Sequence, residues 1–246
     1  MPGPLQLSFY LTVEVRAWEL RSCCTLILMV ELLDSSEKIK TFYLVRHGET
    51  EATAKGRICG HSEVSLSEHG LEQVELAADW FYNIPIDTIF SSPLNRAVQT
   101  TDIIAKAIQK PTYLKHSGLV EKKEGEWEGK TYWELRDQDA KSWEKWSNDP
   151  INFAPPNGES VQDFVARVGR AMKDIIANYD SGNKIILSTH AGVIRSVIMQ
   201  ALDIPVDNFF RIDIPVASIT RVDWSESYST LKFCGLVPEQ FETLVV

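Results

Sequence analysis

Short apolar runs and amphipathic stretches alternate along most of this chain. The runs at 41–45, 87–90 and 184–188 have the length and the β-branched and aromatic content of buried strands. Apolar residues at helical spacing predict helices over 67–82, 94–108, 161–179 and 193–202. Strands that alternate with helices are typical of an α/β fold, in which helices cover the sheet on both faces.

Two of these helices carry capping signals at their starts. Pro93 suits the first position of the 94–108 helix, with Ser92 as its N-cap. Ser160 stands before the 161–179 helix, and Asp163 three residues later makes a variant of the capping box. We therefore expect these two serines to cap the two helices.

Two of the predicted strands end in a histidine close to a glycine. Arg46-His47-Gly48 follows the first strand, and Thr189-His190-Ala191-Gly192 follows the 184–188 strand. Because ligands of open α/β sheets bind at the carboxyl ends of strands, both imidazoles are expected on one rim of the sheet. Arg96 lies in the first turn of the 94–108 helix, where free backbone N–H groups already favour an anion. The sequence thus predicts an anion site.

Six short motifs occur in order between about Lys40 and Trp224. They are Arg-His-Gly-Glu-Thr at 46–50, Arg-x-x-Gly-x-x-Glu-x-x-Leu-x-x-x-Gly at 57–70, Ser-Ser-Pro-Leu-x-Arg-Ala-x-Gln-Thr at 91–100, Leu-x-Glu-x-x-x-Gly-x-Trp-Glu-Gly at 119–129, Pro-x-Gly-Glu-Ser at 156–160 and Ser-Thr-His-Ala-Gly-Val-Ile-Arg at 188–195. Together the motifs resemble those of the histidine phosphatase superfamily, in its phosphoglycerate mutase-like branch. Three positions depart from the family's pattern: Glu63 replaces a more frequent Asp, Thr53 a frequent Asn, and Ala191 a more usual Gly.

The resemblance implies a three-layer sandwich with a mostly parallel central sheet, and a reaction in two steps through a phosphohistidine. His47 would attack phosphorus, since a neutral imidazole is a competent nucleophile at pH 7. Arg46, Arg96 and His190 would bind the phosphoryl oxygens. Glu121 would protonate the leaving alkoxide and then activate water. The other residues expected to contact substrate are Arg57, Thr53, Gly48, Gly60 and Ala191. Glu124 is a neighbouring carboxyl in the loop of Glu121, whereas Glu49 and Glu128 are expected to hold loops together.

Three functions are compatible with this resemblance. The first is a metal-independent phosphomonoesterase acting on a small metabolite, such as a sugar phosphate or α-ribazole phosphate. The second is a cofactor-dependent phosphoglycerate mutase. Mutases of the family carry a longer insertion with extra basic residues, whereas here Glu121 and His190 stand only 69 positions apart and the insertion holds few basic residues: Arg136, Lys141 and Lys145. The third is an inactive phosphate-binding protein, against which the retention of five residues argues: Arg46, His47, Arg96, Glu121 and His190. The sequence favours the phosphatase.

The amino-acid composition restricts the classes of molecule that this protein is expected to bind. Of the 246 residues, 25 are basic and 34 acidic, giving a net charge of −9, which argues against nucleic acid or anionic membranes as partners. The cysteines at 23, 24, 59 and 234 show neither a C-x-x-C pair nor zinc spacing, which suggests reduced thiols in the cytoplasm. No apolar stretch reaches the length of a membrane span. We expect no metal, no cofactor, a small phosphomonoester as ligand, and a monomer or homodimer.

Two segments stand outside the regular alternation. Residues 1–39 precede the family resemblance, and three interpretations stay open: an added element on the domain 40–246, a disordered tail, or an overlong start, with Met29 as another initiation site. The segment of about 131–157 is rich in aromatic and charged residues. It predicts a helical insertion that packs its own tryptophans, a partial lid over the substrate, or both.

Overall fold

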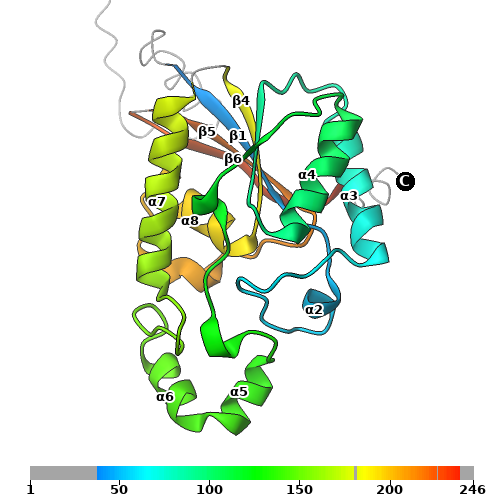
Figure 1. Cartoon of the computed structure of the whole chain (residues 1–246). Coiled ribbons are helices and arrows are strands. Elements are labelled where there is room, and N and C mark those ends of the chain that lie inside the picture. Colours follow the sequence, from blue (N-terminus) through cyan, green and yellow to red (C-terminus); the bar gives the residue numbers. More distant parts are fainter. Residues whose placement is uncertain (1–37, 180–181, 226, 239–246) are drawn as a thin grey trace, which may run out of the picture. The chain divides into compact units, whose positions relative to one another are not determined.

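The computed structural model describes residues 38–179, 182–225 and 227–238 (Figure 1). The expectations for the first 37 residues, including Met29, Cys23 and Cys24, lie outside the described residues. Among the helices that are described, none is long and apolar enough to cross a membrane.

A six-stranded mixed sheet forms the centre of the domain, in the order β3-β2-β4-β1-β5-β6. Its strands are β1 (Lys40–Arg46), β2 (Thr88–Ser91), β3 (Leu114–Lys115), β4 (Lys184–Thr189), β5 (Ile219–Trp224) and β6 (Thr230–Leu236). The first four are parallel to one another, whereas β5 runs antiparallel to β1 and to β6. The three strands predicted from apolar runs are confirmed as β1, β2 and β4, and the sheet is mostly parallel.

Helices cover both faces of the sheet, with α7 (Val161–Asn178) and α8 (Ala191–Ala201) on one face and α3 (Glu68–Trp80) and α4 (Asn95–Ala107) on the other (Figure 1). The side chains of β1 alternate between the two resulting cores, as the pleat of a strand requires. Phe42 and Leu44 pack with α7 and α8, and Tyr43 and Val45 pack with α3. All four are at most 4 % exposed, so the apolar run has no polar face.

The predicted cap of α4 is wrong, and that of α7 is confirmed in part. The N-cap of α4 is Leu94, whose extended backbone (φ −67°, ψ 137°) delays the helix by two residues. The hydroxyl of Ser92 lies 2.8 Å from His190 Nε2 instead. At α7, Ser160 Oγ accepts the N–H of Asp163 at 3.1 Å, but the Asp163 carboxylate accepts from the Ser160 hydroxyl, not from its backbone N–H.

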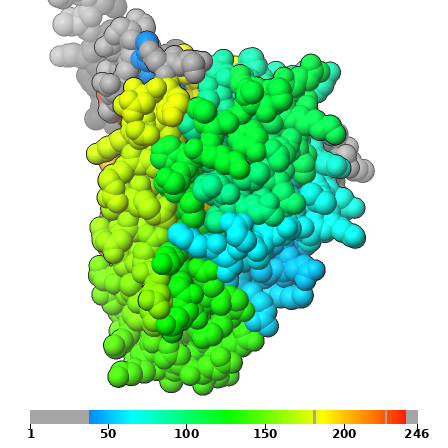
Figure 2. Space-filling model, in the orientation of Figure 1, coloured from blue at the N-terminus to red at the C-terminus, as the bar shows by residue number. Residues whose placement is uncertain are grey.

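The segment 131–157 contains two short helices, α5 (Tyr132–Gln138) and α6 (Ala140–Asn148). The Trp146 ring contacts Tyr132 at 5.6 Å between centroids and Trp143 at 4.8 Å. The insertion also lies against the short helix α2 (Glu51–Ala54) and the loop after it, shown in green and blue in Figure 2. Arg57 of that loop pairs with Glu134 of α5 at 3.0 Å. The remaining short elements are the 3₁₀ turns η1 (Ser117–Leu119), η2 (Gly125–Trp127) and η3 (Val206–Arg211).

Candidate active site

The order of the strands brings the two predicted histidines together. β1 and β4 are parallel neighbours with Arg46 opposite Thr189, so the residues that follow each strand, His47 and His190, lie side by side. Their ring centroids are 5.2 Å apart, with the planes at 62°. Arg96 enters from α4, which follows β2 on the other side of β4. We call Arg46, His47, Arg96 and His190 the cationic cluster.

The hydrogen bonds of His47 determine its tautomer. Arg96 Nε donates to His47 Nε2 at 3.2 Å, so that ring nitrogen must present a lone pair. Nδ1 therefore carries the proton, and it donates to the Gly48 carbonyl at 2.7 Å. Burial, followed by the charges of Arg96 and Arg46, places the pKa of His47 well below its usual 6.5. His47 is therefore neutral at pH 7, with the Nε2 lone pair directed toward a guanidinium.

Two arginines are held rigidly in the cationic cluster. The Arg96 side chain is 1 % exposed, and its terminal nitrogens donate to the carbonyls of Ser62 at 3.0 Å and Gly60 at 2.8 Å. Arg46 donates through Nη1 to the Ile214 carbonyl at 2.5 Å. Because these anchors are backbone atoms, the guanidinium planes are fixed before any ligand arrives.

Three buried side-chain nitrogens lack a partner in the described part of the chain: Arg46 Nε, His190 Nδ1 and Trp127 Nε1. Buried polar atoms are otherwise nearly always paired, so unpaired ones call for a ligand or a solvent partner. Burial, followed by the neighbouring charge of Arg96, places the pKa of His190 well below 6.5, so His190 is neutral. Two of the three unpaired atoms belong to the cationic cluster, which suits an anion with several oxygens.

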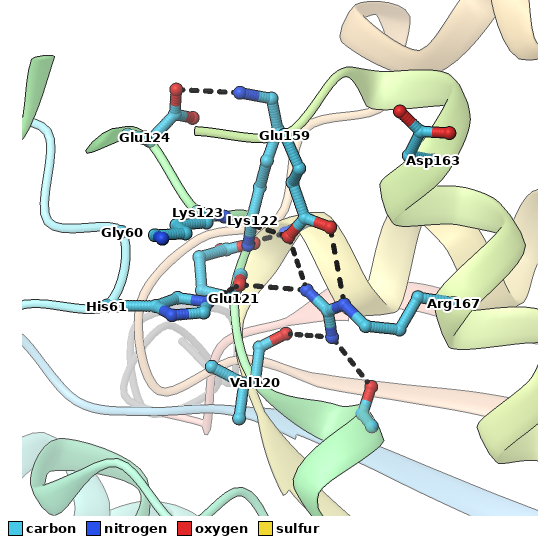
Figure 3. A network of polar contacts seen from close by, with 12 residues as sticks. Gly60, His61, Val120, Glu121, Lys122, Lys123, Glu124, Glu159, Asp163 and Arg167 are labelled. Atoms are coloured by element: carbon cyan, nitrogen blue, oxygen red, sulfur yellow. Dashed lines mark hydrogen bonds and ion pairs between the residues drawn. The ribbon is translucent and has the colours of Figure 1, made fainter. Parts of the chain in front are cut away.

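Glu121 is placed by hydrogen bonds on both its carboxylate and its main chain. The carboxylate accepts the N–H of Gly192, in the first turn of α8, at 3.2 Å and that of Lys122 at 2.8 Å. Figure 3 shows Arg167 of α7 donating to main-chain carbonyls of the same loop, at 3.0 Å to Val120 and 3.1 Å to Glu121. Arg167 also donates to the Gly118 carbonyl at 3.1 Å.

Glu159 extends this network. Its carboxylate pairs with Arg167 at 2.6 Å and accepts the N–H of Lys123 at 2.9 Å (Figure 3). His61 Nε2 lies 2.9 Å from the carbonyl oxygen of Glu121. The loop that carries Glu121 is therefore bound from three directions by long-range contacts, although it contains no regular secondary structure.

A cavity of about 240 Å³ opens beside the cationic cluster. Arg46, His47, Arg96 and Glu121 line one part of it. Much of the remaining surface is aromatic, and we call it the aromatic wall: Trp127, Tyr132, Trp146, Phe209 and Phe210. Lys122 and Glu124 also line the cavity and form an ion pair of 2.7 Å (Figure 3). Burial raises the pKa of Glu124, and the charge of Lys122 opposes that shift.

The other predicted residues differ in how they meet this cavity. Arg57, Thr53, Gly60 and Ala191 line it. Arg57 Nη1 donates to the Gly129 carbonyl at 2.5 Å. Thr53 Oγ1 donates to the Thr50 carbonyl at 2.9 Å within the cap of α2.

Gly48 and His190 do not line the cavity. The N–H of Gly48 donates to Thr100 Oγ1 at 3.3 Å, and a Cβ there would come within 2.7 Å of Val74. Gly48 therefore allows the close approach of α3. His190 is fully buried, with its ring next to that of His47.

Two acidic residues expected to hold loops do so. Glu128 accepts the N–H of His61 at 2.9 Å and the hydroxyl of Ser62. Glu49 accepts the hydroxyl of Ser67 at 2.9 Å. Within the described residues, no three His, Cys, Asp or Glu side chains are grouped as metal ligands.

Sequence reasoning missed Lys122, Arg195 and the Phe209-Phe210 pair as cavity residues. Both lie within the quoted motifs: Lys122 is the residue after Glu121, and Arg195 is five positions after His190, so proximity to those residues was an available signal. The phenylalanine pair carried no such signal. Phe209 also packs into the core, and apolar pairs of this kind are indistinguishable from core residues in a sequence.

Both the sequence and the fold of this chain are similar to those of known phosphatases. Residues 42–236 match the family model described as the histidine phosphatase superfamily (branch 1). The chain is 32% identical over 190 residues to an adenosylcobalamin/alpha-ribazole phosphatase of Salmonella typhimurium, covering 77% of this chain and 93% of that protein. It is 28% identical over 195 residues to a putative phosphoserine phosphatase 2 of Hydrogenobacter thermophilus, covering 79% and 95%. The crystal structure of the alpha-ribazole phosphatase of Shigella flexneri superposes with a TM-score of 0.73 at 27% identity, covering 79% of this chain and 96% of that one.

Proposed function

This chain belongs to the histidine phosphatase superfamily and is a phosphomonoester hydrolase, and on that premise we propose how its own residues carry the reaction. The proposed activity is metal-independent hydrolysis of a small phosphorylated metabolite, of the sugar phosphate or α-ribazole phosphate type, through a phosphohistidine at His47. The observation that carries the proposal is the pair of hydrogen bonds on the His47 ring, which leaves Nε2 deprotonated and directed toward a guanidinium.

In the first step, His47 Nε2 attacks phosphorus, and the bond from phosphorus to the ester oxygen breaks. Arg96 already contacts Nε2. It can therefore stay in contact with the phosphoryl group while that group moves from the ester oxygen to His47. Arg46 and Arg96 stabilise the equatorial oxygens, on which charge is spread in the transition state. His190 packs beside His47, and its Nδ1 has no partner among the described residues and can contact the phosphoryl group.

Glu121 supplies and then removes a proton. It donates to the departing alkoxide, and as a carboxylate it then takes a proton from the water that attacks the phosphohistidine. Inorganic phosphate leaves, and His47 returns to its starting tautomer. The support for Glu121 is its place in the cavity wall and its fixation by the N–H groups of Gly192 and Lys122.

The insertion at 131–157 favours a phosphatase over a phosphoglycerate mutase. The residues that it contributes to the cavity are Tyr132 and Trp146, both aromatic. Its Arg136 pairs with Asp137 at 3.1 Å and is not among the cavity residues. A mutase has to hold a second phosphate, and this segment supplies no charge for one. The insertion acts as a partial lid over the substrate.

The remaining parts of the proposal concern the setting of the enzyme. Its ligand is a small phosphomonoester, with neither nucleic acid nor a membrane as partner. The enzyme works in the cytoplasm as a monomer or homodimer, and Arg57, Thr53, Gly48, Gly60 and Ala191 shape the substrate site. Of these, Gly48 acts indirectly, through the packing of α3.

Trapping the phosphoenzyme tests the proposal. The enzyme is mixed with a labelled phosphomonoester in the presence of a metal chelator and quenched in alkali, in which phosphohistidine survives. We expect a base-stable, acid-labile label in the wild type and none in His47→Ala, with turnover lost as well. His69→Ala is the matched control, since His69 is exposed on α3. More than trace turnover by His47→Ala, or loss of activity with the chelator, would contradict the mechanism.

A further inference from the structure

The ion pair of Lys122 and Glu124 takes no part in the proposed reaction, yet it lines the cavity in which the reaction occurs. Its side chains are 11% and 18% exposed, the lowest combination among the ion pairs of the described residues. A buried ion pair contributes little to stability, because the cost of desolvation offsets the attraction. Its position in a cavity wall instead suggests a role in binding.

Both partners retain hydrogen-bonding capacity. Within the described part of the chain, the Lys122 ammonium contacts one side chain, Glu124, and the Glu124 carboxylate contacts Lys122 through one oxygen. An ammonium has three donors and a carboxylate about four acceptor positions. The pair therefore presents donors and acceptors side by side, and Trp127 of the same cavity adds a buried indole N–H that has no partner among the described residues.

The net charge of the ion pair formed by Lys122 and Glu124 determines which leaving groups it can bind. Because the two charges cancel, the pair offers no net attraction to a carboxylate or an ammonium. A hydroxyl group suits it, since the hydroxyl hydrogen can be donated to Glu124 while its oxygen accepts from Lys122. Arg195 also lines the cavity, so the test must include a carboxylate-bearing substrate.

The aromatic wall favours leaving groups that contain a ring. Tyr132 and Trp146 are stacked, with 23° between their planes and 5.6 Å between their centroids. Such a surface packs against the flat, apolar C–H face of a ring. A ring that carries hydroxyls on its edge combines both requirements.

We propose that Lys122 and Glu124 form a hydroxyl-binding subsite, which with the aromatic wall selects phosphomonoesters of uncharged, hydroxylated rings such as furanose or pyranose sugars. This subsite rests on the proposed function and specifies its substrate class. Lys122 and Glu124 are specificity-determining residues. They contact the alcohol part of the substrate and do not transfer protons.

The test compares substrates with and without hydroxyls. Ribose 5-phosphate and glucose 6-phosphate are compared with propyl phosphate, whose alkoxide is a similarly poor leaving group but carries no hydroxyl. The variant is Lys122→Met/Glu124→Gln, which removes both charges at similar volume. We expect the loss in kcat/KM on the preferred sugar phosphate to exceed the loss on propyl phosphate by about 10–100-fold, the range for hydrogen bonds to charged groups, and to appear mainly in KM.

The exposed pair Glu51 and Lys55 provides the matched control. Its side chains are 82% and 63% exposed, and Glu51→Gln/Lys55→Met should leave the kinetics on all three substrates unchanged. Equal losses on sugar and propyl phosphates in the Lys122→Met/Glu124→Gln variant would overturn the subsite. So would a wild-type preference for phosphoserine or 3-phosphoglycerate over both sugar phosphates. Failure of the wild type to hydrolyse even nitrophenyl phosphate would refute the proposed function itself.

Discussion

Arg46, His47 and Arg96 of the cationic cluster line the same cavity as the aromatic wall, but the two regions are built in different ways. His47, Arg96 and His190 follow strands or begin a helix, and each is at most 4 % exposed. The aromatic wall comes from turns and from the insertion, and its Tyr132 and Phe210 are 42% and 45% exposed. Strand ends are fixed by the sheet ladder, whereas loops can change without loss of the core.

Under the proposed function, this contrast separates the groups that carry out phosphoryl transfer from the groups that determine substrate specificity. Groups proposed to bind the phosphate are anchored to backbone carbonyls, as Arg96 is to Ser62 and Gly60. Groups proposed to bind the alcohol are held by side-chain contacts with one another, as Trp146 is by Tyr132 and Trp143. The superfamily relatives carry names that point to different substrates.

Glu121 lines the same cavity and is the proposed proton donor to the leaving group. Its removal should therefore give the largest difference in rate between substrates with good and poor leaving groups. We expect Glu121→Gln to slow the hydrolysis of alkyl phosphates by about 10²–10⁴-fold, the usual contribution of a positioned acid. Nitrophenolate departs without a proton, so nitrophenyl phosphate should still phosphorylate His47. Dephosphorylation should nevertheless be slow, giving a burst of nitrophenol in stopped-flow measurements. Equal losses on both substrates in single-turnover phosphorylation, with no burst, would show that Glu121 only positions the substrate, and Glu124 or Glu128 would then become the candidate acid.

Arg96 belongs wholly to the cationic cluster, so its removal should not depend on the leaving group. Arg96→Met should lower kcat/KM by about 10²–10³-fold for alkyl and nitrophenyl phosphates alike, because a preorganised charge at the transition state is lost. Competitive inhibition by vanadate should weaken in parallel. Arg136→Met, in the exposed part of the insertion, is the control. A loss confined to alkyl phosphates would show that Arg96 acts on the leaving group. It would contradict the proposed division between a phosphate-binding cationic cluster and an alcohol-binding aromatic wall.

The smallest predicted effect concerns stability. The pKa of His47 in the folded state lies well below the value of about 6.5 in the unfolded chain, because of burial and the charges of Arg96 and Arg46. Below pH 6.5 the unfolded chain therefore binds a proton that the folded protein does not, and stability falls as the pH decreases toward the folded-state pKa. His47 should contribute up to about 1.4 kcal/mol per pH unit to this slope.

Urea unfolding between pH 7.5 and 5.5 measures the effect. His47→Asn should show a shallower loss of unfolding free energy than the wild type in this window, and His190→Asn should behave similarly, since burial also lowers the pKa of His190. His69→Asn, on the exposed face of α3, should keep the wild-type slope. Identical slopes for His47→Asn and the wild type would show that His47 takes up its proton in the folded state.

Much of the framework could be predicted from the sequence because it depends on local patterns. The apolar runs identified β1, β2 and β4, since a buried parallel strand leaves a continuous apolar signature. Helical spacing identified α3, α4, α7 and α8. The placement of His47 and His190 followed from a general rule about strand ends. The wrong cap at Ser92 shows the limit of such signals, because a long-range partner, His190, engaged the hydroxyl that the local rule assigned to the helix.

Local patterns in the sequence were enough to predict the α/β class, the positions of the main strands and helices, and the residues of the cationic cluster. The tertiary contacts were needed to show which nitrogen of His47 is free, that His190 is fully buried next to it, and that Lys122, Glu124 and Phe210 enter the same cavity. The two kinds of feature differ in how far apart along the chain the interacting residues are. Hydrophobic periodicity and strand ends are properties of a few consecutive residues, whereas a tautomer or a cavity wall depends on groups separated by dozens of positions. Those groups meet only when the sheet order and the loop packing are fixed.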